Sequence, residues 1–218
     1  MIKKPGWEKL MLKGIIFDFD GVIAESVQVK TDAFAGIYKT YGPDIVKKVV
    51  EHHESNGGMS RFEKIKFYHE SFLNKTITEE EITDLANQFS SLVVEKVIAA
   101  PYVPGALEYI QESYKHYKLF ISTGTPTGEM QIILKRKKIA KYFTDVFGSP
   151  EKKTVHVYNI LSNYNLKPDE VMFYGDSNSD LDAAKISDIP FILIQNSFNE
   201  KLRSTYKGKI INNFIGVS

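Results

Sequence analysis

Short apolar runs that end in polar residues recur along the chain. The first covers residues 14–17, where Gly-Ile-Ile-Phe is followed at once by a carboxylate. An uninterrupted apolar run of this length is typical of a strand buried on both faces of a parallel sheet. Similar runs predict strands at residues 119–122, 145–147, 171–174 and 191–194, with 209–211 as a candidate edge strand. Because helix-like segments separate several of these runs, the pattern predicts an α/β fold, a doubly wound parallel sheet.

Residues 25–99 show a different pattern that contains no strand-like run. Their periodicity predicts helices near residues 27–40, 44–54, 60–72 and 78–97. Thr78 and Glu81 lie three residues apart at the start of the last segment, which is the spacing of a capping box. A connector with two prolines and a glycine, residues 99–105, then leads back to the sheet. We therefore predict a helical insertion at 25–99 in a core formed by residues 1–24 and 100–218.

Length and charge limit what the protein can do. A chain of 218 residues has room for one core with a smaller insertion, but not for many domains. Lys and Arg number 28 against 27 Asp and Glu, which gives a net charge of +1. No overall field would draw such a protein to nucleic acid or to anionic lipid, so neither partner is expected. A small anionic substrate would need local cations.

The cysteine content and the length of the apolar runs indicate the cellular compartment in which the protein is expected. The sequence has no cysteine, which excludes disulfides, zinc-thiolate sites and thiol catalysis. No apolar run approaches the roughly 20 residues that span a bilayer. The start of the chain has lysines but no apolar stretch of the kind found in secretory signals. We expect an intracellular, cytoplasmic protein in which residues 1–10 are a dispensable extension.

Four polar clusters follow predicted strands, where ligands bind in open α/β sheets. They are Asp18-Phe19-Asp20-Gly21-Val22, Ser122-Thr123-Gly124-Thr125-Pro126, Lys152-Lys153, and Gly175-Asp176-Ser177-Asn178-Ser179-Asp180. Two carboxylates spaced i, i+2 can project to one side, and a second acidic cluster can complete a cage of oxygen atoms. Such a cage suits Mg²⁺, which needs no nitrogen or sulfur ligand. An isolated Asp-x-Asp is typical of a turn, but four clusters in this order favour a site.

The order of these clusters resembles the haloacid dehalogenase-like hydrolase superfamily. The resemblance covers the whole core, and it implies a Rossmann-like core domain with an inserted helical cap of the C1 type at residues 25–99. It points to the capped phosphatases, a branch that includes phosphoglycolate phosphatases and β-phosphoglucomutases. A cap that closes over the site would exclude water and bring residues that recognise the substrate to the phosphate.

The resemblance assigns roles to individual residues. It implies that Asp18 is the nucleophile that attacks the phosphoryl group, and that Asp20 is the general acid and then the general base. It implies that Mg²⁺ is held by Asp18, Asp176 and the Asp20 carbonyl, with Asp180 in a supporting role. A strand-end hydroxyl and a lysine would neutralise charge on the phosphoryl group.

The pattern leaves three assignments open. Thr123 is taken as the strand-end hydroxyl, although Ser122 and Thr125 leave its register open. Lys153 fits the expected spacing better than Lys152 does. Gly124 and Arg61 are expected to contact the substrate; Arg61 follows the glycine-containing loop at residues 56–60, and a surface role for it is the alternative. The five histidines show no metal-ligand spacing and are interpreted as surface or cap residues.

These inferences predict a Mg²⁺-dependent phosphomonoester hydrolase that acts on a small phosphorylated metabolite through an aspartyl-phosphate intermediate. A phosphomutase of the same superfamily is the nearest alternative. A non-enzymatic phosphoacceptor or ligand-binding module is disfavoured, because Asp20 supplies a general acid and base that such a module would not need. The sequence predicts neither the substrate nor the oligomeric state.

Overall fold

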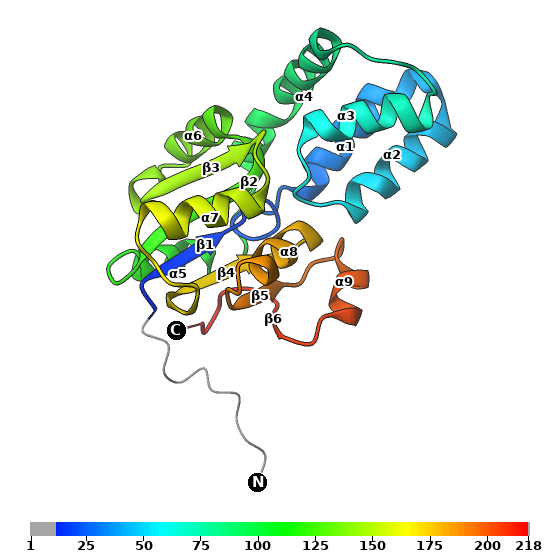
Figure 1. The fold of residues 1–218 in the computed structure, drawn as a ribbon. Helices are drawn as coiled ribbons and strands as arrows, with labels where there is room; N and C mark the ends of the chain where they lie inside the picture. The colour runs from blue at the N-terminus through cyan, green and yellow to red at the C-terminus, as the bar shows by residue number, and fades with distance from the viewer. Residues whose placement is uncertain (1–11, 218) are drawn as a thin grey trace.

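A sheet of six parallel strands forms the centre of the core. The computed structural model describes residues 12–217, with strands β1 (Gly14–Phe17), β2 (Lys118–Pro126), β3 (Asp145–Ser149), β4 (Val171–Gly175), β5 (Phe191–Ile194) and β6 (Lys209–Ile211). Their order is β3-β2-β1-β4-β5-β6, with β6 at an edge (Figure 1). The predicted doubly wound parallel sheet is therefore confirmed, and the chain reverses its direction of winding at β1.

Both faces of the sheet are covered, which explains why β1 is apolar throughout. Ile15 and Phe17 pack into the larger apolar core, with α5 (Ala106–Ser113) and α6 (Thr127–Arg136). Ile16 points to the opposite face and packs with α7 (Lys153–Asn163) and α8 (Asn178–Ile186). The last helix, α9 (Glu200–Thr205), precedes β6, and short 3-10 turns occupy Ala140–Tyr142 and Pro168–Glu170.

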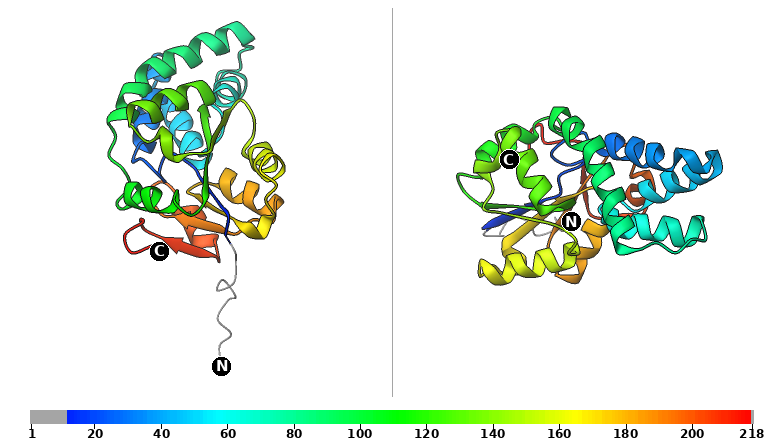
Figure 2. Two further views of the ribbon diagram at one scale, coloured as in Figure 1. Left: turned by 90° about the vertical axis from the view of Figure 1, so that its left-hand side faces the viewer. Right: turned by 90° about the horizontal axis from the view of Figure 1, so that it is seen from above.

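The segment between β1 and α5 is helical, as predicted. It contains α1 (Val27–Tyr38), α2 (Pro43–Ser55), α3 (Arg61–Phe67) and α4 (Glu79–Ala99), with a 3-10 turn at Lys39–Tyr41 and a short π-helix at Tyr68–Phe72. The capping box of Thr78 and Glu81 is present at the start of α4. These helices group together to one side of the sheet (Figures 1 and 2), around the buried aromatic rings of Phe34, Tyr38, Tyr68 and Phe89. We call residues 25–99 the cap; its boundaries remain a prediction.

Three sequence-based expectations concern the start of the chain, membrane helices and the histidines. The predicted dispensable extension, residues 1–10, lies outside the described part of the chain. Within residues 12–217, no helix combines the length and the apolar character needed to cross a bilayer. The interpretation of the histidines as surface or cap residues is wrong for His156, which lies fully buried in the core on α7. Its ring nitrogens bond Ser122 Oγ on β2 at 3.0 Å and the Gly148 carbonyl on β3 at 3.2 Å.

Candidate active site

The two carboxylates that follow β1 have different partners. Asp18 is buried, its Oδ1 accepts a hydrogen bond from the Phe19 amide at 2.6 Å, and its Oδ2 lies 2.7 Å from Lys153 Nζ. Asp20 points toward the cap, where it accepts hydrogen bonds from Ser26 Oγ at 2.6 Å and from Lys30 Nζ. One strand end therefore presents one carboxylate to the core and the other to the cap.

Gly21 allows this turn to approach the neighbouring strand. Its φ is +77°, and a Cβ atom at this position would lie 2.1 Å from Asp176 Oδ2. The left-handed backbone and the close contact both require glycine. The glycine of the Asp-Phe-Asp-Gly motif therefore brings the β1 turn against Asp176, which follows β4.

Lys153 connects two of the carboxylates. It is the first residue of α7 and is buried, whereas the adjacent Lys152 is exposed. Lys153 Nζ lies 2.7 Å from Asp18 Oδ2 and 2.6 Å from Asp180 Oδ1. Burial would lower the pKa of Lys153, but the charges of Asp18 and Asp180 raise it above its ordinary value. Of the two lysines, Lys153 is thus the one that lies in the site.

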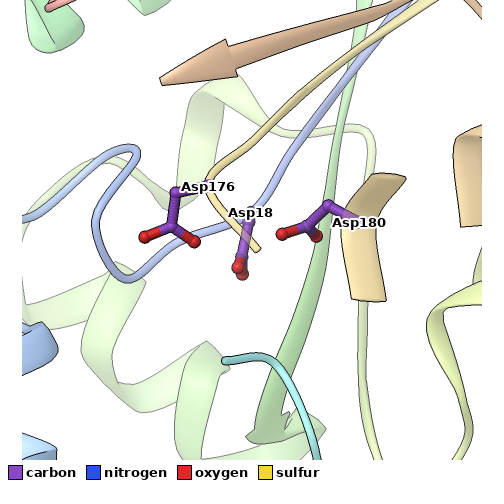
Figure 3. Close-up of side chains that lie close together, drawn as sticks. All are labelled: Asp18, Asp176 and Asp180. Carbon is purple, nitrogen blue, oxygen red and sulfur yellow. The ribbon is translucent and has the colours of Figure 1, made fainter. Parts of the chain in front are cut away.

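Three carboxylates gather where β1 and β4 end. Asp18, Asp176 and Asp180 each offer an oxygen, and these oxygens lie within 4.8 Å of one another (Figure 3). Asp176 Oδ2 also accepts a hydrogen bond from Asn196 Nδ2 at 2.7 Å. Asp180 is more fully engaged, because its Oδ2 accepts hydrogen bonds from Ser177 Oγ at 2.5 Å and from the Ser177 amide at 3.1 Å. Asp18 and Asp176 are therefore better placed than Asp180 to bind a ligand.

The charges of this cluster fit a divalent cation. Burial, only partly offset by Lys153, raises the pKa of Asp18 to about 7. Burial and the neighbouring charges of Asp18 and Asp180 raise the pKa of Asp176 well above its ordinary value. Three buried carboxylates thus share one lysine, and a cation bound between Asp18 and Asp176 would supply the missing positive charge. The all-oxygen donor set is the kind that Mg²⁺ prefers.

The hydroxyl groups at the end of β2 point to different partners. Ser122 Oγ bonds His156 in the core, and Thr125 Oγ1 accepts a hydrogen bond from Lys30 Nζ at 2.7 Å. Thr123 is buried, and its Oγ1 accepts a hydrogen bond from the Thr125 amide at 3.2 Å. None of these contacts joins Thr123 to Asp18, so its phosphate-binding role stays a prediction. Gly124 lies on the wall of the cavity between the carboxylates and the cap.

A cavity of about 360 Å³ separates the carboxylates from the cap. Its core wall includes Asp18, Asp20, Gly124 and Asp176. Its cap wall includes the cations Lys30, Arg61 and Lys64 together with His53, Phe34 and Phe89. A cavity of this size suits a small metabolite.

Arg61 lies on the cavity wall, but its guanidinium is already paired. Two of its nitrogens bond the two carboxylate oxygens of Glu129 on α6, at 2.9 and 2.6 Å, and Ser90 Oγ on α4 accepts a further hydrogen bond. The side chains of Arg61 and Glu129 are only 4% and 10% exposed. Arg61 is therefore not the surface residue considered as an alternative: it joins the cap to the core, and its contact with substrate stays a prediction.

The glycines of the cap loop at residues 56–60 lie directly on the core. Ser179 Oγ donates to the Gly57 carbonyl at 3.0 Å. A Cβ atom on Gly58, whose φ is +76°, would lie 2.1 Å from Ser179 Oγ, and one on Gly124 would lie 2.7 Å from the Gly58 carbonyl oxygen. The cap is thus closed against the core at a point where only glycine backbone fits.

Several site residues were not anticipated from the sequence. Lys30, Lys64 and His53 come from cap helices, Glu129 from α6 and Asn196 from the segment after β5. Lys30 is ten residues from Asp20 and Glu129 is three residues from Pro126, whereas His53, Lys64 and Asn196 lie farther from the four polar clusters. No short-range signal marks them, because the cap residues and Glu129 are brought to the site by the packing of the cap on the core, and Asn196 by the packing of the segment after β5 against Asp176.

Comparisons with known proteins identify the family of the chain. The haloacid dehalogenase-like hydrolase family matches residues 15–194, and the chain belongs to that family, as the resemblance in the sequence implied. A phosphorylated carbohydrates phosphatase from Thermotoga maritima is 30% identical over 189 residues, 82% of this chain and 82% of that protein. A phosphoglycolate phosphatase from Pasteurella multocida is 24% identical, covering 79% of this chain and 80% of that protein. The β-phosphoglucomutase structure from Clostridium difficile shares the fold, with a TM-score of 0.74, 19% identity and coverage of 95% of this chain and 93% of that one.

Proposed function

We propose that the protein is a Mg²⁺-dependent phosphomonoester hydrolase that acts on a small phosphorylated metabolite through a phosphorylated Asp18. The observation that carries the proposal is the position of Asp18, which faces a capped cavity with Lys153 on one side and Asp176 on the other. The broader expectation of an enzyme of the phosphatase type is confirmed by the family match and by the phosphatase relatives.

The proposed reaction has two displacement steps. In the first, a carboxylate oxygen of Asp18 forms a bond to phosphorus as the bond from phosphorus to the ester oxygen breaks, and Asp20 protonates the departing alcohol. In the second, Asp20 takes a proton from a water molecule, whose oxygen bonds to phosphorus and displaces Asp18. The products are the alcohol and inorganic phosphate, and both carboxyl groups return to their starting states.

The environments of the two carboxylates suit these roles. Lys153 lies beside Asp18 and would neutralise part of the charge of the phosphoryl group. Burial would raise the pKa of Asp20, but the charge and hydrogen bond of Lys30 and the hydrogen bond of Ser26 hold it below its ordinary value. Asp20 is thus held as the ionised base of the second step. A phosphate dianion in the cavity would favour the proton that the first step needs.

Mg²⁺, when bound, would lower the negative charge that opposes attack on the phosphoryl group. Asp18, Asp176 and the main-chain carbonyl of Asp20 would hold it, and Asp180 would position Lys153 and Ser177. Thr123 is proposed to bind the phosphoryl group, and Gly124 and Arg61 to contact the rest of the substrate. The cytoplasmic location predicted from the sequence also stays a prediction.

Release of phosphate from p-nitrophenyl phosphate tests the proposal. Turnover should require Mg²⁺ and stop with EDTA, and Asp176→Ala should raise the Mg²⁺ requirement or abolish turnover. Asn196→Ala removes the hydrogen bond to Asp176 and the one that Asn196 Oδ1 accepts from the Phe198 amide, keeps the Asp176 carboxylate, and serves as the milder companion variant. Full activity in the presence of EDTA would exclude a role for Mg²⁺ in turnover.

Dependence on the leaving group tests the role of Asp20. Asp20→Asn should reduce turnover of a sugar phosphate far more than that of an aryl phosphate, because an aryl oxide leaves without a proton. Equal losses would remove Asp20 from the acid role. A screen of phosphorylated metabolites for released phosphate then identifies the substrate class, and transfer of the phosphoryl group within a sugar without its release would indicate a mutase.

A further inference from the structure

Lys64 on α3 is a buried cation on the cavity wall. Its side chain is 2% exposed, and its Nζ atom lies 2.8 Å from His53 Nδ1 and 3.3 Å from the His53 carbonyl oxygen. Within residues 12–217, no carboxylate lies at ion-pairing distance from Lys64. Because an unpaired buried charge is costly, an anion at this place would stabilise the charged form of Lys64.

The other buried cations around the cavity have carboxylate partners. Arg61 is paired with Glu129, Lys153 with Asp18 and Asp180, and the largely buried Lys30 with Asp20. Each of these charges is therefore already compensated by a carboxylate of the protein. Glu54 also lies on the cavity wall, yet it forms no ion pair with Lys64. Among the cavity cations that the structure describes as buried, Lys64 is the exception.

The surroundings of Lys64 favour contact with an anion. Burial and the charges of Lys64 and Lys30 hold the pKa of His53 well below its ordinary value, so its imidazole is neutral and supplies no counter-charge. The Phe34 ring centroid lies 5.8 Å from Lys64 Nζ. Burial, together with the charges of Lys30 and Lys153, lowers the pKa of Lys64 to about 7. An anion beside Lys64 would relieve this accumulation of positive charge, and low local polarity would strengthen the contact.

We propose that Lys64, held in place by His53, is a specificity-determining residue that binds a second anionic group of the substrate, a carboxylate or another phosphate. The inference rests on the proposed phosphatase function, in which the transferred phosphoryl group occupies the Asp18 end of the same cavity. The substrate class is then a small phosphomonoester that carries a further acidic group. Lys64 is used for recognition, whereas Lys153 serves the reaction.

Matched pairs of esters test this proposal. One pair is 2-phosphoglycolate and 2-hydroxyethyl phosphate, and the other is glucose 1,6-bisphosphate and glucose 6-phosphate. In the wild type we expect kcat/KM to favour the member with the second anion by about ten- to a hundredfold in at least one pair, because a hydrogen bond between charged groups is formed. The pair that shows the preference distinguishes a carboxylate from a phosphate.

Substitution of Lys64 should remove that preference. Lys64→Met keeps the length of the side chain without its charge, and it should bring the ratio within about threefold of one, mainly through KM. Lys64→Arg should keep part of the preference. Lys66→Met is the matched control, since Lys66 is exposed on the same helix, and it should leave the ratio unchanged. Equal preference in wild type and Lys64→Met, or no preference in either pair, would overturn the proposal.

Calorimetric binding separates this inference from the proposed function. Asp18→Asn protein lacks the nucleophile, so each ester can be titrated without turnover. Tighter binding of the doubly anionic member should disappear in Asp18→Asn/Lys64→Met. If the wild type hydrolyses no ester at all, including p-nitrophenyl phosphate, the phosphatase proposal fails, while this titration still decides whether Lys64 recognises the second anion. Thermal unfolding of each variant verifies that it is folded.

Discussion

The ion pair between Arg61 on α3 and Glu129 on α6 should contribute measurably to stability. Two parallel hydrogen bonds join the nearly buried groups, and Ser90 Oγ also donates to Glu129 at 2.7 Å. Removing one partner of a buried pair leaves the other uncompensated, which costs about 3–5 kcal/mol. Glutamine keeps one acceptor oxygen, so we expect Glu129→Gln to lower the free energy of unfolding by about 3 kcal/mol, at the low end of that range.

Urea unfolding followed by far-UV circular dichroism measures this change. Arg61→Met should destabilise similarly, but Arg61→Met/Glu129→Leu should lose about 2–3 kcal/mol less than the sum of the single variants, because no charge is left unpaired. The exposed pair of Lys47 and Glu51, 3.9 Å apart, is the control, and Glu51→Gln should change stability by less than about 0.5 kcal/mol. If Glu129→Gln had a similarly small effect, or if the effects of the two single variants on the free energy of unfolding simply added in the double variant, the inference that this ion pair holds the cap on the core would be refuted.

Two further predictions concern the cap loop and the effect of pH. Gly124→Ala should reduce kcat/KM at least about tenfold, because the new Cβ atom would displace the Gly58 carbonyl. Gly128→Ala is the control and should not reduce kcat/KM, since its Cβ atom would meet nothing within 4 Å. Equal activities of the two variants would contradict the close packing of Gly124 on Gly58. Burial and the charge of Lys153 lower the pKa of His156 to about 4, so the folded protein holds this imidazole neutral. Because the unfolded chain binds the proton more readily, the contribution of His156 to the free energy of unfolding is present above about pH 6.5 and is lost as the pH falls toward 4. The free energy of unfolding should therefore fall by about 2 kcal/mol from pH 7 to pH 5 through this group. Urea titrations should show a smaller fall in His156→Gln, and an unchanged fall would exclude His156 as the cause.

The core could be predicted from the sequence because its signals are local. An apolar run such as residues 14–17 is sufficient to predict a buried strand, and the polar residue that follows it marks the ligand end of the sheet. Because helices alternate with the predicted strands, the strands can be predicted to pair in parallel. Asp18, Asp176 and Asp180 could be brought together on these grounds, and the structure places their oxygens close together.

The cap wall of the site could not be predicted in the same way. Lys64 and His53 lie eleven residues apart on different helices, and Arg61 meets a partner 68 residues away. Helical periodicity shows which face of a helix is apolar, but not which core residue a buried cation will meet. The register of Thr123 is a related case, because alternate side chains of one strand point to opposite faces and Ser122 bonds the buried His156. His156 itself carries no sequence signal of its buried position.

Phosphate release by wild type and Asp18→Asn, assayed side by side with p-nitrophenyl phosphate and Mg²⁺, tests the nucleophilic role of Asp18 most directly. The amide nearly preserves the shape of the side chain but cannot attack phosphorus. Turnover should fall by at least about a thousandfold, while the thermal unfolding midpoint should not decrease, because the variant removes one of three neighbouring buried carboxylates. A folded Asp18→Asn protein that kept more than about a tenth of wild-type turnover would contradict the formation of a phosphorylated Asp18.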